Sequence, residues 1–134
     1  MKTKTKTIRQ TVTFNASPQA VYDALIDSKK HSAFTGQKAV ISKKQGGKYF
    51  AYGGYHGGVN LELKPGKKIV QSWHAQNWPK GHFGKAVFNF SKTKTGTKLS
   101  FVHYGVPDFD YKGITNGWKE FYWDKMKAYF AKKK

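Results

Sequence analysis

The chain has 134 residues and no cysteine, and its 25 lysine and arginine residues against 7 aspartates and glutamates give a formal net charge of +18. This length suits one domain over residues 1–134, and the lack of cysteine excludes disulfides, thiolate metal ligands and cysteine nucleophiles. No apolar run is long enough to span a membrane and no apolar signal-peptide core follows Met1, so we expect a cytoplasmic protein with no membrane span.

The positive charge favours acidic partners, but its composition argues against a dedicated reader of nucleic acid. Arg9 is the only arginine among the 25 basic residues, and the rest are lysines spread along the whole chain. Arginine is the side chain best suited to bidentate recognition of bases and phosphates. We therefore expect no specific nucleic-acid site.

The first part of the chain predicts one strand followed by one or two short helices. Apolar side chains alternate over residues 8–14, as in a strand with one buried face. Ser17-Pro18 then supplies an N-cap and a proline at the first helical position. Asp27-Ser28 is a second capping signal, so a brief turn or helix follows and ends near Gly36.

An antiparallel meander is expected from Lys38 to Tyr104. Turn residues, most of them with glycine, separate runs that are rich in strand-forming side chains. We predict strands at 38–42, at 49–52, in a segment that ends at 63, and at 68–75, 82–91 and 97–104.

The last segment, residues 113–130, is the one long stretch with helical rather than alternating periodicity. A curved antiparallel sheet with one long helix available wraps around that helix. The predicted fold class is α+β, in the helix-grip arrangement. About six or seven strands surround a long C-terminal helix, with one or two short helices after the first strand.

Aromatic side chains on the inward faces of sheet and helix are candidates for lining a ligand cavity between the two layers. His56, His74 and His103 could serve as polar groups there. The alternative is that the large rings simply fill the core. The candidate lining residues are Trp73, Phe88, Phe90, Phe101, His103, Trp118, Phe121 and Tyr122.

Two features suggest a surface for a protein partner. On a regular α-helix, Trp123, Met126 and Phe130 lie about 140° from the main apolar stripe. They either form an exposed patch, since such residues are common at interfaces, or are covered by loops at the back of the helix. Trp78 and His82, in the loop 77–82, either plug one end of the sheet or face a partner.

No catalytic or metal-binding constellation is evident in the sequence. The five histidines lack the spacing of a helical metal site, and the seven carboxylates form no recognisable acid/base pair. Serine-hydrolase, phosphate-loop and dinucleotide motifs are missing. We expect a non-enzymatic protein with no metal and no cofactor.

An ordered set of short motifs resembles a known family over nearly the whole chain. The set comprises Ser17-Pro18, Phe34-Thr35, residues 46–49, Leu63-Lys64-Pro65, Ile69-Val70, Trp73, residues 78–83, Thr97-Lys98-Leu99, Gly105-Val106-Pro107 and Gly117-Trp118. It is similar to the C-terminal domain of the activator of the heat-shock protein 90 ATPase. That domain lies within the START-like (Bet v 1-like, SRPBCC) superfamily.

The resemblance implies a co-chaperone-like binder of a heat-shock protein 90 type chaperone or of another acidic protein. The alternative that it leaves open is the carriage of a small hydrophobic ligand between sheet and helix. In that family the complete co-chaperone also has an N-terminal domain that grips the chaperone's middle segment. Met1 leads almost directly into the first strand, so we expect that domain to be absent, and stimulation of a chaperone ATPase without it stays open. A cavity of roughly 300 Å³ or more would favour the ligand role.

Overall fold

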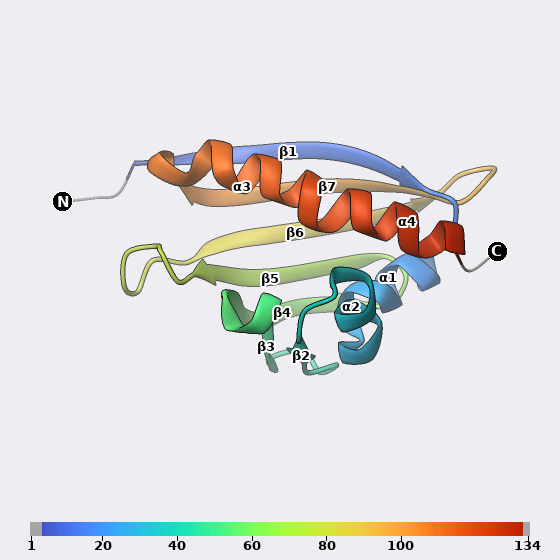
Figure 1. The fold of residues 1–134 in the computed structure, drawn as a ribbon, viewed down its shortest axis with the longest axis horizontal. Helices are drawn as coiled ribbons and strands as arrows, with labels where there is room; N and C mark the ends of the chain where they lie inside the picture. Colours follow the sequence, from blue (N-terminus) through green and yellow to red (C-terminus); the bar gives the residue numbers. More distant parts are fainter. Residues whose placement is uncertain (1–3, 133–134) are drawn as a thin grey trace.

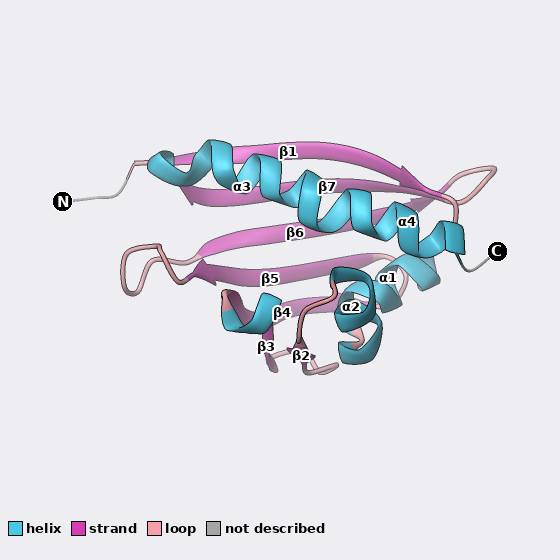
Figure 2. Cartoon of the chain, in the orientation of Figure 1, coloured by secondary structure: helices cyan, strands magenta, loops and turns pink. Residues whose placement is uncertain are grey.

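A seven-stranded antiparallel sheet forms one layer of the molecule, with the strand order β1-β7-β6-β5-β4-β3-β2. The computed structural model describes residues 4–132. The strands are β1 (Thr5–Phe14), β2 (Val40–Ile41), β3 (Lys48–Ala51), β4 (His56–Lys64), β5 (Lys68–Ala75), β6 (Gly84–Lys92) and β7 (Thr97–Pro107). Figures 1 and 2 show the sheet as the layer behind the helices.

The helices all lie on one side of this sheet (Figures 1 and 2). They are α1 (Pro18–Ile26), α2 (Ser28–Thr35), the 3₁₀ turns η1 (Tyr52–Gly54) and η2 (Asp108–Asp110), α3 (Tyr111–Gly117), the π-helical turn η3 (Trp118–Trp123) and α4 (Asp124–Lys132). We call the continuous stretch of α3, η3 and α4 the C-terminal helix. It runs along β1, β7 and β6, so the predicted helix-grip arrangement is confirmed.

Strand boundaries differ from the prediction chiefly at the two edges of the meander. The strand expected at 38–42 contracts to β2, which pairs only through Val40 with Phe50 and Ile41 with Tyr49. The last strand extends past Tyr104 to Pro107, because β1 also pairs with it there, from Thr5 onwards. The periodicity of the sequence alone does not reveal how many residues of a strand pair with a neighbouring strand.

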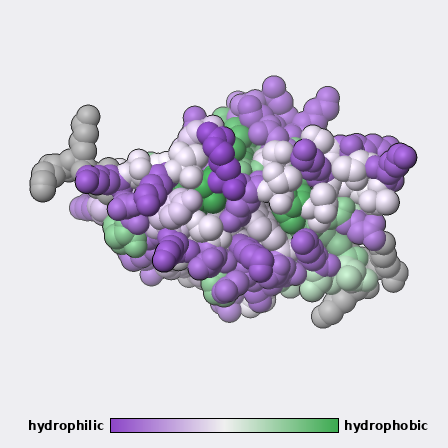
Figure 3. All heavy atoms as spheres, turned by 90° about the horizontal axis from the view of Figure 1, so that it is seen from above, coloured by the Kyte–Doolittle hydropathy of each residue, from purple (hydrophilic) through white to green (hydrophobic). Residues whose placement is uncertain are grey.

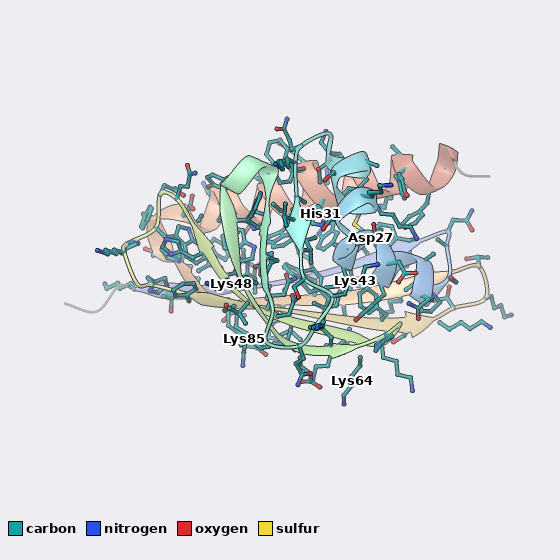
Figure 4. All side chains as sticks on the ribbon, turned by 90° about the horizontal axis from the view of Figure 1, so that it is seen from below. Asp27, His31, Lys43, Lys48, Lys64 and Lys85 are labelled. Atoms are coloured by element: carbon teal, nitrogen blue, oxygen red, sulfur yellow. The ribbon has the colours of Figure 1, made fainter. Side chains whose placement is uncertain are left out.

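Both predicted caps form, and together they place the short helices. The Ser17 hydroxyl accepts a hydrogen bond from the Ala20 N–H at 3.1 Å, and the Asp27 carboxylate accepts one from the Lys30 N–H at 3.1 Å. The Lys43 ammonium lies 2.9 Å from Asp27, from the segment between β2 and β3 (Figure 4). That bond to Lys43 and the cap bond lower the pKa of Asp27. The cap thus fixes the start of α2, which carries His31.

The core lies between the inward face of the sheet and the C-terminal helix. Inward-facing residues of the strands are buried, among them Ile8 of β1, Ile69 of β5 and Leu99 of β7. Removing these side chains from water is the main favourable contribution to folding. On β7, Phe101 and His103 point inward and Tyr104 points outward.

The π-helical turn rotates the second half of the C-terminal helix. The Asp124 N–H donates to the Lys119 carbonyl five residues earlier, so this turn holds one residue more than an α-helical turn. One extra residue turns every later side chain back by about 100°. The angle around the helix axis between Trp123 and the main apolar stripe therefore falls from about 140° to about 40°.

The expectation of an exposed second stripe on this helix is therefore wrong. Trp123, Met126 and Phe130 are only 4%, 0% and 6% exposed. The Phe14 ring lies 6.3 Å from Trp123 and 5.9 Å from Phe130, measured between ring centroids. The Trp123 indole N–H also donates to the Gln10 side-chain oxygen at 2.6 Å. Trp123 and Phe130 thus join the helix to β1, Met126 is buried in the core, and none of the three is available to a partner.

Candidate functional site

A cavity of about 360 Å³ lies between the first half of the C-terminal helix and the β4–β5 part of the sheet. Its walls are mainly aromatic, and exposed Tyr55 and Phe121 lie at its mouth. Its lining residues come from the C-terminal helix, from η1, and from β4 and β5 with the residues beside them, and the helix and η1 lie on the same side of the sheet (Figure 1). The lining residues are Tyr52, Tyr55, His56, Trp73, Asp110, Gly113, Ile114, Gly117, Trp118, Phe121 and Tyr122.

Two glycines of α3 open the helix side of this cavity. Gly113 and Gly117 are four residues apart, so they lie on one face of the helix. A Cβ atom at position 117 would meet its nearest neighbour, a ring carbon of Phe121, at 3.7 Å. Glycine costs about 1 kcal/mol in a helix relative to alanine. Glycine at these positions therefore leaves room in the cavity at the expense of helix stability.

Tyr122 is held at the back of the cavity by two buried histidines. Its hydroxyl lies 3.0 Å from Nε2 of His31 and 3.0 Å from Nε2 of His56. The second ring nitrogen of His31, Nδ1, lies 3.1 Å from the carbonyl oxygen of Leu25. One hydroxyl thus links α2, β4 and the C-terminal helix.

These contacts determine where the protons lie. A carbonyl only accepts, so Nδ1 of His31 carries its hydrogen and Nε2 has a free lone pair. The Tyr122 hydroxyl donates to that lone pair, and its oxygen then accepts from Nε2–H of His56. Nδ1 of His56 is left as a bare acceptor, and no described residue donates to it.

Burial keeps this network neutral. Desolvation lowers the pKa of His31 to about 4, and it lowers the pKa of His56 to about 3 with small contributions from His31 and His103. Burial also raises the pKa of Tyr122 well above its ordinary value. The network of Tyr122, His31 and His56 therefore holds fixed hydrogen-bonding groups and no charge at neutral pH.

A second polar pair lies deeper between helix and sheet. The Trp118 indole N–H donates to Nδ1 of His103 at 3.0 Å, so the hydrogen of the neutral His103 ring is on Nε2. Desolvation lowers the pKa of His103 to about 3. Trp73 lies between the two regions, with its ring 4.5 Å from His56 in a stacked arrangement and 4.8 Å from His103.

Three buried ring nitrogens have no hydrogen-bond partner within residues 4–132: Nδ1 of His56, Nε1 of Trp73 and Nε2 of His103. A buried polar atom without a partner is costly and uncommon in folded proteins. His56 and Trp73 line the cavity, although these two nitrogen atoms are themselves buried.

Tyr52 anchors the π-helical turn from the far side of the cavity. Its hydroxyl donates to the carbonyl oxygen of Phe121, within that turn. Its backbone has a φ of +52°, an unusual value for a bulky side chain, directly before Gly53. Burial raises the pKa of the Tyr52 hydroxyl, which stays protonated and can donate.

The structure divides the predicted cavity residues into two groups. Trp73, Trp118, Phe121 and Tyr122 line the cavity, although Phe121 is 49% exposed at its mouth. The others are buried in the core and do not line it: Phe88, Phe90, Phe101 and His103. Of the other two histidines proposed as polar groups, His56 lines the cavity, whereas His74 lies outside it and its Nδ1 contacts the His82 carbonyl at 2.7 Å.

Trp78 closes one end of the fold and is not available to a partner. Its ring is buried 4.9 Å from Trp73, and its indole N–H donates to the Asp110 carboxylate at 2.8 Å. His82 is half-buried and its Nε2 contacts the Gly105 carbonyl at 2.7 Å. The loop 77–82 thus plugs the end of the sheet.

A shallow groove of about 540 Å³ lies elsewhere, lined by residues of β2, β3 and β4 together with Phe83. Phe83 and Val40 are 55% and 47% exposed, and the exposed side chain of Lys48 also lines the groove. Lys64 and Lys85 project on the side of the sheet away from the C-terminal helix (Figure 4). An apolar strip beside lysines is suited to an acidic partner with apolar side chains.

The face of the molecule seen in Figure 3 is mostly hydrophilic. Figure 3 shows one face on which hydrophobic residues form only small, separate patches.

Among residues 4–132, no three histidine, aspartate or glutamate side chains are placed to hold a metal ion. Within the same range, no helix is long and apolar enough to cross a membrane.

Sequence reasoning missed Tyr52, Tyr55, Asp110, Gly113, Ile114 and Gly117 as lining residues. The two glycines carried a usable signal, since a four-residue spacing in an amphipathic helix places them on one face. No pattern in the sequence indicates that Tyr52 and Tyr55 line the cavity, because η1 bends the chain at the glycines between them and brings both rings to the helix.

Comparison with known proteins gives consistent results along the chain. A family model described as "Activator of Hsp90 ATPase homolog 1-like protein" matches residues 15–131. A Dictyostelium discoideum protein named "Activator of 90 kDa heat shock protein ATPase homolog" is 36% identical over 131 residues, which is 97% of this chain and 34% of that protein. A mouse protein named "Activator of 90 kDa heat shock protein ATPase homolog 1" is 29% identical over 89% of this chain and 35% of its own length.

Solved structures share the fold. An HSP90 activator from Plasmodium falciparum has a TM-score of 0.86 at 21% identity, over 93% of this chain and 96% of that one. The Aha1 dimer from Colwellia psychrerythraea has a TM-score of 0.78 at 20% identity, over 93% of this chain and 96% of that one. The chain spans about a third of the length of the curated relatives it matches. From the family match and the Dictyostelium relative, the chain belongs to the family of activator of Hsp90 ATPase homolog 1-like proteins.

Proposed function

We propose that this chain binds an Hsp90-type chaperone and alters its ATPase cycle, without catalytic activity of its own. The observation that carries the proposal is the family match over residues 15–131, together with relatives that are named as activators of this ATPase. Binding one conformation of the chaperone more tightly than another would shift its population, which is sufficient to change its turnover. A cytoplasmic place of action is part of the same proposal.

The groove beside Phe83 is the surface that suits such a partner. Its apolar lining, Val40 and Phe83 included, can bury side chains of a partner segment, and Lys48 can pair with a carboxylate next to them. The net charge of +18 would steer an acidic protein towards this chain. The proposed occupant is therefore an acidic chaperone segment with interspersed apolar residues.

A pair of matched double substitutions tests this surface. Lys48→Glu combined with Phe83→Ser should weaken binding to an Hsp90-type chaperone by about 10-fold or more, because both groove contacts are lost. Lys127→Glu combined with Phe109→Ser is the control, since it makes the same chemical changes at an exposed lysine of α4 and at a phenylalanine that is 65% exposed outside the groove. Affinity measured by calorimetry at one fixed salt concentration compares the two. Equal effects of the two variants would contradict a groove-specific contact.

A second candidate function is the binding of a small, mainly apolar molecule in the cavity. The observation that favours it is the space itself, about 360 Å³, which lies in the usual range for small-molecule sites. This function and chaperone binding use different faces of the molecule, so one protein can have both. Binding of a small aromatic probe, followed through the indole signals of Trp73 and Trp118, tests it.

A further inference from the structure

The outer face of the sheet points away from the helices, all of which lie on the other side (Figures 1 and 2). Two of its aromatic side chains are open to solvent, Phe83 at 55% and Tyr104 at 40% exposure. Phe83 belongs to this face because its ring lies 5.2 Å from the ring of His74, whose neighbour Trp73 points into the core. Exposed rings of this kind are flat surfaces on which another ring can stack.

Lysines lie beside these rings, in one row that crosses the sheet from strand to strand. Lys85 is opposite Tyr104, with its ammonium nitrogen 5.5 Å from the centre of that ring, and it projects away from the C-terminal helix (Figure 4). At the other end of the row, Lys48 borders the groove that Phe83 also lines. From β7 to β3 the members of the row are Tyr104, Lys85, Ser72, Val59 and Lys48.

Negative charge is nearly absent from this outer face. Of the seven carboxylates, Glu62 is the one that lies in a strand, and Lys64 and Lys68 approach it to 3.4 and 3.7 Å. Neither Lys48 nor Lys85 has a carboxylate partner among residues 4–132. The other carboxylates lie in the helices or directly beside them: Asp23, Asp27, Asp108, Asp110, Glu120 and Asp124. The lysines of the outer face therefore keep their charge uncompensated.

We propose that the outer face of the sheet binds single-stranded nucleic acid without regard to its sequence. Bases stack on Phe83 and Tyr104, and phosphates of the same strand lie at Lys48 and Lys85. This activity goes beyond the proposed chaperone function. Since Phe83 and Lys48 belong to both surfaces, the two partners would exclude each other.

The scarcity of arginine does not argue against this kind of binding. Arginine is needed where a protein reads base edges, whereas lysine binds a phosphate as a point charge. Stacking of a base on an aromatic ring tolerates any sequence, because every base has a flat face. A lysine-rich face with open rings is thus suited to a strand and unsuited to a particular sequence.

A single strand matches the outer face better than other polyanions do. Each nucleotide joins a flat ring to a phosphate, so one strand supplies partners for the rings and for the lysines together. In a duplex the bases are paired and stacked inside, where Phe83 and Tyr104 do not reach them. An acidic peptide of glutamates supplies the charge without the rings.

Three labelled probes test the proposal by fluorescence anisotropy on the full chain at low salt. They are an oligothymidylate of about 12 nucleotides, a duplex of the same length, and an oligoglutamate with the charge of the oligothymidylate. We expect the single strand to bind about 10-fold more tightly than either of the others. The comparison with the duplex is sharp, because the duplex carries twice the charge and would win by electrostatics alone.

Removing the rings should weaken binding without changing its response to salt. Phe83→Ala combined with Tyr104→Ala should lower the affinity for the single strand by about 10-fold or more, since stacking is lost. The slope of log affinity against log salt concentration should stay the same. Phe109→Ala is the control, because Phe109 is 65% exposed on η2, on the helix side, and it should leave the affinity unchanged.

Removing the lysines should change the response to salt itself. Lys48→Ala combined with Lys85→Ala should reduce the magnitude of that slope by about 1.4, because each phosphate contact to a single strand contributes about 0.7. Lys119→Ala combined with Lys127→Ala, at two exposed lysines of the C-terminal helix, should leave it unchanged. The urea midpoint of each variant shows that it is folded.

The other results overturn the proposal in distinguishable ways. No binding of the single strand at low salt would exclude the activity. A duplex that binds as tightly, or unchanged affinity without the two rings, would show attraction by charge alone and no stacking. Tightest binding of the oligoglutamate would make the outer face a surface for acidic proteins, so that this proposal fails while the proposed chaperone function stands.

Discussion

At the scale of single residues, the Tyr122 hydroxyl joins parts of the chain that are far apart in sequence. It contacts His31 on α2 and His56 on β4 at 3.0 Å each, from within the C-terminal helix. The same network fixes the tautomer of His56, with its hydrogen on Nε2. One hydroxyl group thus holds three elements of the fold together.

Removing this hydroxyl should be costly. Tyr122→Phe leaves Nε2 of His31 and Nε2–H of His56 buried without partners, so we expect a loss of about 2–4 kcal/mol in the free energy of unfolding. Tyr104→Phe is the control, because Tyr104 is 40% exposed on the outer face of the sheet, and it should cost less than about 0.5 kcal/mol. Urea unfolding of both variants measures the difference. Similar losses for the two would contradict the role of the network.

The buried histidines should make stability depend on pH. Burial holds the pKa values at about 4 for His31 and about 3 for His56 and His103, below their ordinary value of 6.5. Below pH 6.5 these histidines are therefore protonated in the unfolded chain but stay neutral in the folded chain. Stability is complete above pH 6.5 and falls towards pH 4, by up to about 1.4 kcal/mol per pH unit for each histidine.

Urea midpoints at pH 8, 7, 6 and 5 check this sign and this window. We expect these histidines to change the urea midpoint little between pH 8 and 7 and to lower it clearly by pH 5. A midpoint at pH 5 equal to that at pH 7 would contradict the lowered pKa of all three histidines, since any one of them would reduce stability at pH 5. Constant ionic strength is needed, because the chain has a high net charge.

Which single residues line the cavity could be predicted only in part from the sequence. Trp73, Trp118 and Tyr122 follow from strand alternation and helical periodicity. Tyr52 does not, and neither does His31, which lies outside the cavity and contacts its lining residue Tyr122. Their positions depend on the short elements η1 and α2, and short segments have no periodicity to read. Tertiary contacts alone bring them to the helix.

At the scale of elements, the π-helical turn is the feature that sequence periodicity could not predict. A pattern read at 100° per residue assumes an unbroken α-helix. The extra residue within Trp118–Trp123 moves Trp123, Met126 and Phe130 from an expected outer stripe into the core, with Trp123 and Phe130 against Phe14 of β1. It also leaves the Phe121 carbonyl for the Tyr52 hydroxyl, beside the cavity. Turns of this kind are frequent at functional sites.

Two truncations on this helix measure the rotation. Met126→Ala should cost about 2–5 kcal/mol, because Met126 is completely buried. Phe121→Ala should cost about 1 kcal/mol or less, because Phe121 is about half exposed. Thermal or urea unfolding gives both values. A larger loss for Phe121 than for Met126 would restore the regular α-helical phase and contradict the π-helical turn.

The other elements were more readily predicted. Ser17-Pro18 and Asp27-Ser28 do cap two short helices, and the strand expected at 68–75 is β5. Caps and turns are local, so they can be read from a few neighbouring residues. The length of β2 was overestimated, because it is set by pairing with β3 and not by the sequence of β2 itself.

At the scale of the whole molecule, the charge and the family resemblance bear on the partner rather than on the fold. The ordered motifs of the sequence indicate the family by themselves, and the match over residues 15–131 confirms that family. A net charge of +18 gives a long-range attraction to acidic proteins, which raises association rates at low salt. Contact with a chaperone is the proposal that joins these two observations.

The most direct measurement of this proposal is a titration of the chain into an Hsp90-type chaperone, with complex formation and ATPase rate recorded at low and at physiological salt. We predict a complex whose association rate falls as salt rises, because the attraction is screened, and a changed ATPase rate at saturation. The Lys48→Glu and Phe83→Ser double variant should show both effects more weakly. No complex at low salt, with an unchanged ATPase rate, would contradict chaperone binding.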